Sequence, residues 1–150
     1  MHIVAASAWI GIDVLVAVLV GTGALATDPA LRGLAYQALA TFIFVPMAVA
    51  ALATLTSGVL LGLATRWGLV RYWWVAVKLV LNVVMVVLIF MVLRPGMSGV
   101  GVAGAELVAE GSTSADLSLL VFPPTVSLTM LLLATVLAVT KPWGRLRRAA

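Results

Sequence analysis

The sequence predicts an all-α, polytopic membrane protein, an antiparallel bundle of four transmembrane helices that forms a single domain over residues 1–150. Three observations predict this class. The chain is 64% hydrophobic and only 9% charged, whereas soluble domains carry about 25% charged residues. Its apolar residues form four long runs, and a membrane-crossing helix needs about 20 such residues. The runs are continuous, whereas the strands of a membrane barrel alternate over about ten positions.

Four residue ranges carry the predicted spans. They are about 2–25, 34–65, 70–93 and 117–140, and a basic tail follows at 141–150. The first run could be confused with a secretory signal peptide. It lacks Lys and Arg at its amino end and exceeds the usual apolar core of about 7–15 residues. We therefore interpret it as a span.

The second run is longer than one span needs, so we expect a tilted helix or one that extends past the membrane. Pro46 lies inside this run, and a proline lacks the N–H that a helix interior requires, so we expect a kink there. Gly58 and Gly62 have the G-x-x-x-G spacing that lets two helix backbones approach closely. This spacing indicates helix packing inside the bundle or, as the alternative, between subunits of a homo-oligomer.

The segment between the third and fourth runs, about residues 94–116, is rich in glycine and serine, and we expect a mobile loop. It contains a literal G-x-G-x-x-G over Gly99–Gly104. That motif binds dinucleotides only between a strand and a helix, so we interpret the match as chance. Pro123 and Pro124 occur early in the fourth run and leave open whether residues 117–124 are helical.

The distribution of positive charge predicts the orientation. Arg66 and Arg71 lie in the second connection, and four more basic residues lie in the tail at 141–150, whereas acidic residues offset the arginines of the other connections. Excess Lys and Arg marks the cytoplasmic side, so we expect both termini in the cytoplasm, with the protein in a bacterial inner membrane. Because these cations lie beside membrane ends, they indicate contact with anionic lipid head groups rather than with nucleic acid.

Two ionic side chains lie inside predicted spans, Asp13 in the first and Lys78 in the third. A charge within a span is costly unless it is paired or faces the bundle interior. The predicted topology places the two at similar depths, and Asn82 shares the helix face of Lys78. We therefore predict that Asp13 and Lys78 are paired, directly or through water, with Asn82 as a further partner. Trp9 and Trp74 each precede one of these charges by one helical turn and complete the predicted ligand or ion-pair site.

Two interpretations of this site stay open. A paired charge can simply fix how helices pack, whereas an ionisable group inside a membrane is also a candidate proton or ligand site. The serines lack a nearby base, and the acidic residues of the third connection lack a histidine partner. No catalytic residue is therefore assigned, and a non-catalytic membrane component is favoured over an enzyme. A small ion or solute transporter, or a channel-like oligomer, is the alternative.

Short patterns in two of the predicted spans resemble a known family. His2…Trp9-x-Gly11 and Trp74-x-x-x-Lys78 are similar to the bacterial membrane proteins related to copper-resistance protein D and HemJ-type protoporphyrinogen oxidase. The resemblance implies a four-helix bundle, with haem b or copper handled near His2 and Lys78. His2 is the only histidine, so one protomer cannot offer two imidazoles to a haem iron. The candidate second ligands are Met47, Met85, Met91 and Met130.

Overall fold

The computed structural model describes residues 1–65 and 68–140, and over these residues it is helical and has no strand. The elements in chain order are α1 (His2–Leu25), α2 (Pro29–Phe42), α3 (Phe44–Ala64), α4 (Trp73–Leu88), the π-helical segment η1 (Ile89–Leu93), α5 (Arg94–Glu110), the 3-10 helix η2 (Ser118–Val121) and α6 (Phe122–Thr140). Four stretches are long and apolar enough to cross a membrane: α1, α3, the continuous helix Trp73–Glu110, and Ser118–Thr140. The all-α class and the four apolar helices are confirmed. Arg66 and the tail at 141–150 lie outside the described residues.

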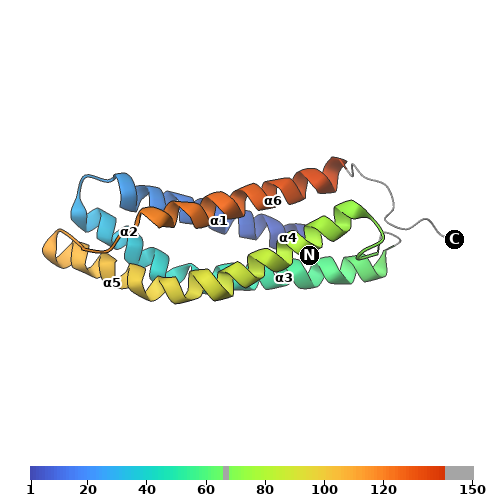
Figure 1. Ribbon diagram of the computed structural model, residues 1–150, viewed down its shortest axis with the longest axis horizontal. Helices are drawn as coiled ribbons and strands as arrows, with labels where there is room; N and C mark the ends of the chain where they lie inside the picture. The colour runs from blue at the N-terminus through green and yellow to red at the C-terminus, as the bar shows by residue number, and fades with distance from the viewer. Residues whose placement is uncertain (66–67, 141–150) are drawn as a thin grey trace.

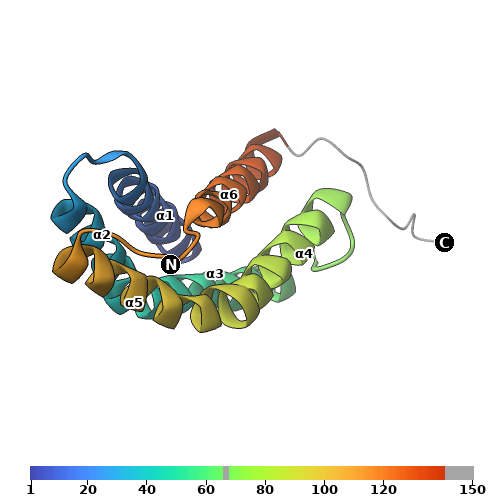
Figure 2. The ribbon, with the colours of Figure 1, turned by 60° about the vertical axis from the view of Figure 1, so that its left-hand side comes forward.

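The helices form two layers (Figures 1 and 2). In one layer α2 leads directly into α3, and α4 leads through η1 into α5, so that two long rods lie side by side. Helix α2 packs against α5 at one end of this layer, and α3 packs against α4 at the other. Helices α1 and α6 form the second layer, where they contact each other.

The second apolar run forms two helical segments, α2 and α3, which follow each other directly with an interruption at Ile43. Helix α2 begins at Pro29, where the Asp28 carboxylate accepts a hydrogen bond of 2.9 Å from the Ala30 N–H. An aspartate cap followed by proline is a favoured helix start. The break between the helices is at Ile43. Ile43 keeps helical backbone angles, with φ of −84° and ψ of −37°. The interruption lies one turn before Pro46, which has no N–H to bond to the carbonyl of Phe42, so it agrees with the disruption expected from Pro46.

The prediction of a mobile loop over residues 94–116 is wrong for most of that range. Helix α4 continues through η1 and α5 for 38 residues to Glu110. The glycines of α5 explain the error, because they pack rather than turn. A Cβ placed on Gly104 would lie 2.7 Å from the Gly33 carbonyl oxygen of α2, so both residues must be small for the backbones to approach. The helix ends at Gly111, whose φ of 73° suits glycine.

The continuous helix is longer than a bilayer requires. At a rise of about 1.5 Å per residue its 38 residues would span about 57 Å, whereas the hydrocarbon core is about 30 Å thick. Part of this helix therefore extends beyond the hydrocarbon, or the helix crosses at a steep tilt.

The question left open at residues 117–124 is answered. Residues Ser118–Val121 form a 3-10 turn, and α6 begins at Phe122 with both prolines in its first turn. The Asp116 carboxylate accepts a hydrogen bond of 3.0 Å from the Ser118 N–H. Hydrogen bonding to Ser118 holds the pKa of Asp116 below its usual value.

The core lies along one face of α1. That face carries Trp9, Asp13, Val16, Val20 and Gly23 at helical spacing, and all five are buried. Near the end of α1, the Arg32 Nε donates a hydrogen bond of 2.8 Å to the carbonyl of Gly23, which ties α1 to α2.

Large apolar side chains remain exposed on most of the helices. On α1 alone, Val4, Val14 and Val18 are each at least half exposed. A soluble protein rarely exposes such continuous apolar surface. The outer surface therefore suits lipid.

Candidate functional site

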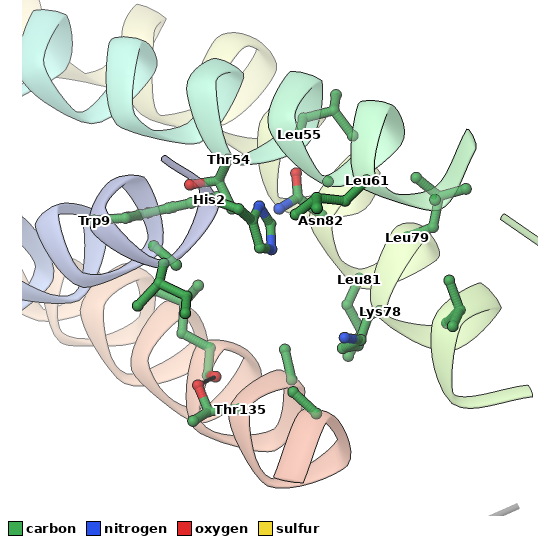
Figure 3. Close-up of a pocket in the computed structure, with 18 of the residues that line it drawn as sticks. His2, Trp9, Thr54, Leu55, Leu61, Lys78, Leu79, Leu81, Asn82 and Thr135 are labelled. Atoms are coloured by element: carbon green, nitrogen blue, oxygen red, sulfur yellow. Dashed lines mark hydrogen bonds between the residues drawn. The ribbon is translucent and has the colours of Figure 1, made fainter. Parts of the chain in front are cut away.

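A cavity of about 470 Å³ lies among α1, α3, α4 and α6 (Figure 3). Small-molecule pockets typically have volumes of about 300–1,000 Å³. Residues of the α3–α4 connection also line it, so it lies toward the end of the molecule where that connection runs. Most of the lining is apolar. Among the described residues, the polar side chains in the lining are those of His2, Ser7, Thr54, Thr65, Lys78, Asn82 and Thr135.

Gly58 and Gly62 line the cavity and contact residues of their own chain. A Cβ on Gly58 would lie 3.1 Å from Cε1 of the His2 ring, and one on Gly62 would collide with Leu69. Both glycines thus make room for neighbouring side chains inside the protomer. This use of the G-x-x-x-G pattern corresponds to internal packing.

His2 is anchored to α3 through its ring. Its Nδ1 lies 3.0 Å from the Ser57 hydroxyl oxygen, and that hydroxyl donates to the carbonyl of Ala53. Because Ser57 uses its proton on the backbone, Nδ1 of His2 is the donor to Ser57. In the neutral ring the lone pair is then on Nε2, which can accept a hydrogen bond or bind a metal.

Lys78 and Asn82 enter the cavity from α4, opposite His2 (Figure 3). The Lys78 Nζ lies 4.5 Å from the centroid of the Trp74 ring, a cation–π distance that holds the ammonium group beside the ring. One turn further along α4, the Asn82 Oδ1 is buried and has no hydrogen-bond partner among the described residues.

Trp9 provides a second unpaired polar atom in the lining. Its side chain is 0% exposed, and its Nε1–H has no hydrogen-bond acceptor within the described part of the chain. A buried polar atom without a partner costs about 1–3 kcal/mol.

Asp13 does not line the cavity. It lies one helical turn beyond Trp9, is fully buried, and accepts a hydrogen bond from the Ser127 hydroxyl of α6 through Oδ2. Its Oδ1 has no hydrogen-bond partner among the described residues. The prediction of a direct pair between Asp13 and Lys78 is therefore wrong, and a link through water stays a prediction. The physical reason is that α1 packs mainly against α2, α3 and α6, and not against α4.

The structure brings most of the predicted site residues together at the cavity. These are His2, Trp9, Gly58, Gly62, Trp74, Lys78 and Asn82. No sequence pattern indicated the hydroxyl residues Thr54 and Thr135 of the cavity lining, or Ser127, the partner of Asp13. Thr54 and Thr135 bond to carbonyls one turn earlier in their helices, at 2.8 Å each. Isolated Ser and Thr residues in apolar helices commonly do this, so no pattern distinguishes the ones at a site.

Three of the candidate ligands for a metal or haem, His2, Met85 and Met130, line the cavity. Over residues 1–65 and 68–140 no group of three or more His, Asp or Glu side chains could hold a metal ion. Met85 and Met130 line the cavity together with His2, whereas Met47 belongs to the core and Met91 is 72% exposed. A His–Met set at the cavity would offer one imidazole and soft sulfur donors.

Comparison with known proteins gives no relative: no family model, no curated protein and no solved structure matches the chain. The resemblance to copper-resistance protein D and HemJ-type proteins gains no support from these comparisons. The function is therefore inferred from the cavity itself.

Proposed function

We propose that this chain is a non-catalytic integral membrane protein that binds a small amphiphilic molecule in the cavity among α1, α3, α4 and α6. The observation that carries the proposal is the make-up of the cavity wall, in which a few polar groups are set among apolar side chains. Sites of this kind bury most of a ligand and orient it through the polar groups.

The proposed location is the bacterial inner membrane, with membrane lipids as partners and both termini in the cytoplasm. The apolar surface and the four long helices support a membrane location. The charge bias of the sequence supports the orientation. In this orientation the cavity lies in the cytoplasmic half of the membrane, since the α3–α4 connection contributes to its wall.

The test fills the cavity and leaves the lipid-facing surface apolar. Ala134 lines the cavity from α6, and Val136, two residues on, is 55% exposed and is not part of the lining. We expect Ala134→Phe to abolish binding of an added single-chain amphiphile, and Val136→Phe to retain it. Native mass spectrometry of protein released from membranes measures the bound mass. Equal binding by the two variants would contradict the proposal.

A haem- or copper-binding protein is a second candidate, favoured by the presence of His2, Met85 and Met130 in one lining. Purified protein with a Soret band, or with copper that His2→Ala removes, would favour it. A colourless protein free of copper would exclude it.

Transport through the same cavity is a further alternative. Solute flux into proteoliposomes that Ala134→Phe blocks and Val136→Phe does not would favour transport over static binding.

A further inference from the structure

We infer that the cavity selects a single-chain amphiphile with an anionic head group, a carboxylate or a phosphate monoester, which Lys78 binds. This inference rests on the proposed function and adds the chemical class of the ligand. It follows from the charges in the lining and from the volume of the cavity.

The charges in the lining are of one sign. The described lining residues include Lys78 and His2 but no Asp or Glu. Asp13 is behind Trp9 and hydrogen-bonded to Ser127. The other acidic residues of the chain are in or beside α2 and α5, or precede η2: Asp28, Glu106, Glu110 and Asp116. A cation in an apolar wall attracts anions strongly because the surroundings screen it poorly.

The hydrogen-bonding groups suit an anionic head. The Lys78 ammonium group is a donor in the lining, and the oxygen of a carboxylate or phosphate is a strong acceptor. The Asn82 amide can present either its oxygen or its NH₂ by a half-turn, because the two ends are nearly the same size. It can therefore accept from a protonated phosphate or donate to a carboxylate.

The Trp74 ring helps to fix the position of the Lys78 side chain. Its Nζ is 4.5 Å from the Trp74 ring centroid, and its stem emerges one turn before Asn82 on the same helix. Both side chains line the cavity from α4, Asn82 beside His2 and Lys78 nearer to Leu81 (Figure 3).

The remaining wall suits one alkyl chain. It is lined by Leu55, Leu61, Leu79, Leu81, Met85, Met130 and Leu131. A volume of about 470 Å³ is in the lower half of the range for small-molecule sites. It accommodates a head and one chain more readily than a whole phospholipid with two chains.

The experiment compares head groups on one chain. Protein in nanodiscs of zwitterionic lipid is titrated with dibrominated stearate, with the matching alcohol and amine, and with the matching monoalkyl phosphate. Bromine quenches the fluorescence of Trp9 and Trp74 when the chain enters the cavity. We expect the carboxylate or the phosphate to bind at least about tenfold more tightly than the alcohol, as expected for a charge-assisted hydrogen bond. The amine should bind most weakly. The order of carboxylate and phosphate identifies the head group.

Variants assign the preference to Lys78. Lys78→Met should remove the advantage of the anion over the alcohol, and Lys78→Arg should keep it. Ala134→Phe should show only the quenching that comes from probe dissolved in the lipid. Wild-type protein that binds anion, alcohol and amine alike would overturn the inference and leave the proposed function standing. Quenching equal to that of Ala134→Phe with every probe would overturn both.

Discussion

At the scale of single residues, Asp13 is the clearest departure from what the sequence predicts. Its position in α1 indicates a buried carboxyl, and the structure agrees, but its partner is a neutral hydroxyl on α6. Burying an ionised carboxylate without a cation costs more than burying a neutral group of the same shape. Asp13 therefore links α1 to α6 and is not directly paired with Lys78.

The hydrogen bond between Asp13 and Ser127 predicts how substitutions at these two residues affect stability. Asp13→Asn keeps the shape and can still accept from Ser127, so we expect stability within about 1 kcal/mol of wild type. Ser127→Ala leaves the carboxyl without its donor and should cost about 1–3 kcal/mol. Unfolding in detergent, followed by circular dichroism, measures both. A larger loss for Asp13→Asn than for Ser127→Ala would show that the carboxylate charge is needed, and would revive the ion-pair hypothesis.

At the scale of elements, the contact between α2 and α5 turns a glycine-rich segment into a helix. Glycine in a helix interior is unfavourable by about 1 kcal/mol relative to alanine, which is why the segment resembles a loop. Gly33 and Gly104 offset that cost because their backbones approach closely. One turn earlier in α5, a Cβ placed on Gly101 would lie 3.3 Å from the Cβ of Ala40. Close backbone packing of this kind is the main attraction between helices in lipid.

The contact can be tested with two glycines of α5. Gly104→Leu should destabilise the protein by about 1–3 kcal/mol, since the side chain would overlap the backbone of α2. Gly99→Ala is the control: a Cβ there meets nothing within 4 Å, so helix propensity should stabilise it by up to about 1 kcal/mol. Thermal unfolding of both variants measures the difference. Equal effects would mean that α2 and α5 do not pack in this way.

At the scale of the whole molecule, two long rods and two shorter helices must fit one bilayer. The bent layer of α2–α3 and α4–α5 exceeds the thickness of the hydrocarbon, whereas α1 at 24 residues is close to it. The cavity forms where α3, α4 and α6 surround the first turns of α1.

The orientation can be measured directly because the chain has no cysteine. A single Cys at Ser112 should react with an impermeant maleimide added to intact spheroplasts, since the α5–η2 connection is predicted to face outward. A Cys at Val70, which is part of the α3–α4 connection, should react only after lysis. Both positions are exposed. The reverse pattern would place the cavity in the outer half of the membrane.

Features that depend on local composition could be read from the order of the amino acids alone. Apolar runs of sufficient length form helices in lipid because the backbone has no other way to satisfy its polar groups, so the helical class and the four apolar helices could be predicted. The spacing of Trp9, Trp74, Lys78 and Asn82 likewise placed each on one face of its own helix.

Which helix faces meet could be known only from the three-dimensional arrangement of the helices. Helical periodicity states the face on which Asp13 lies but not the neighbouring helix that covers it, and α6 rather than α4 covers it. The helical state of residues 94–110 and the existence of the cavity depend in the same way on contacts between segments distant in sequence. These contacts are set by packing among several helices at once, and no single stretch of sequence contains that information.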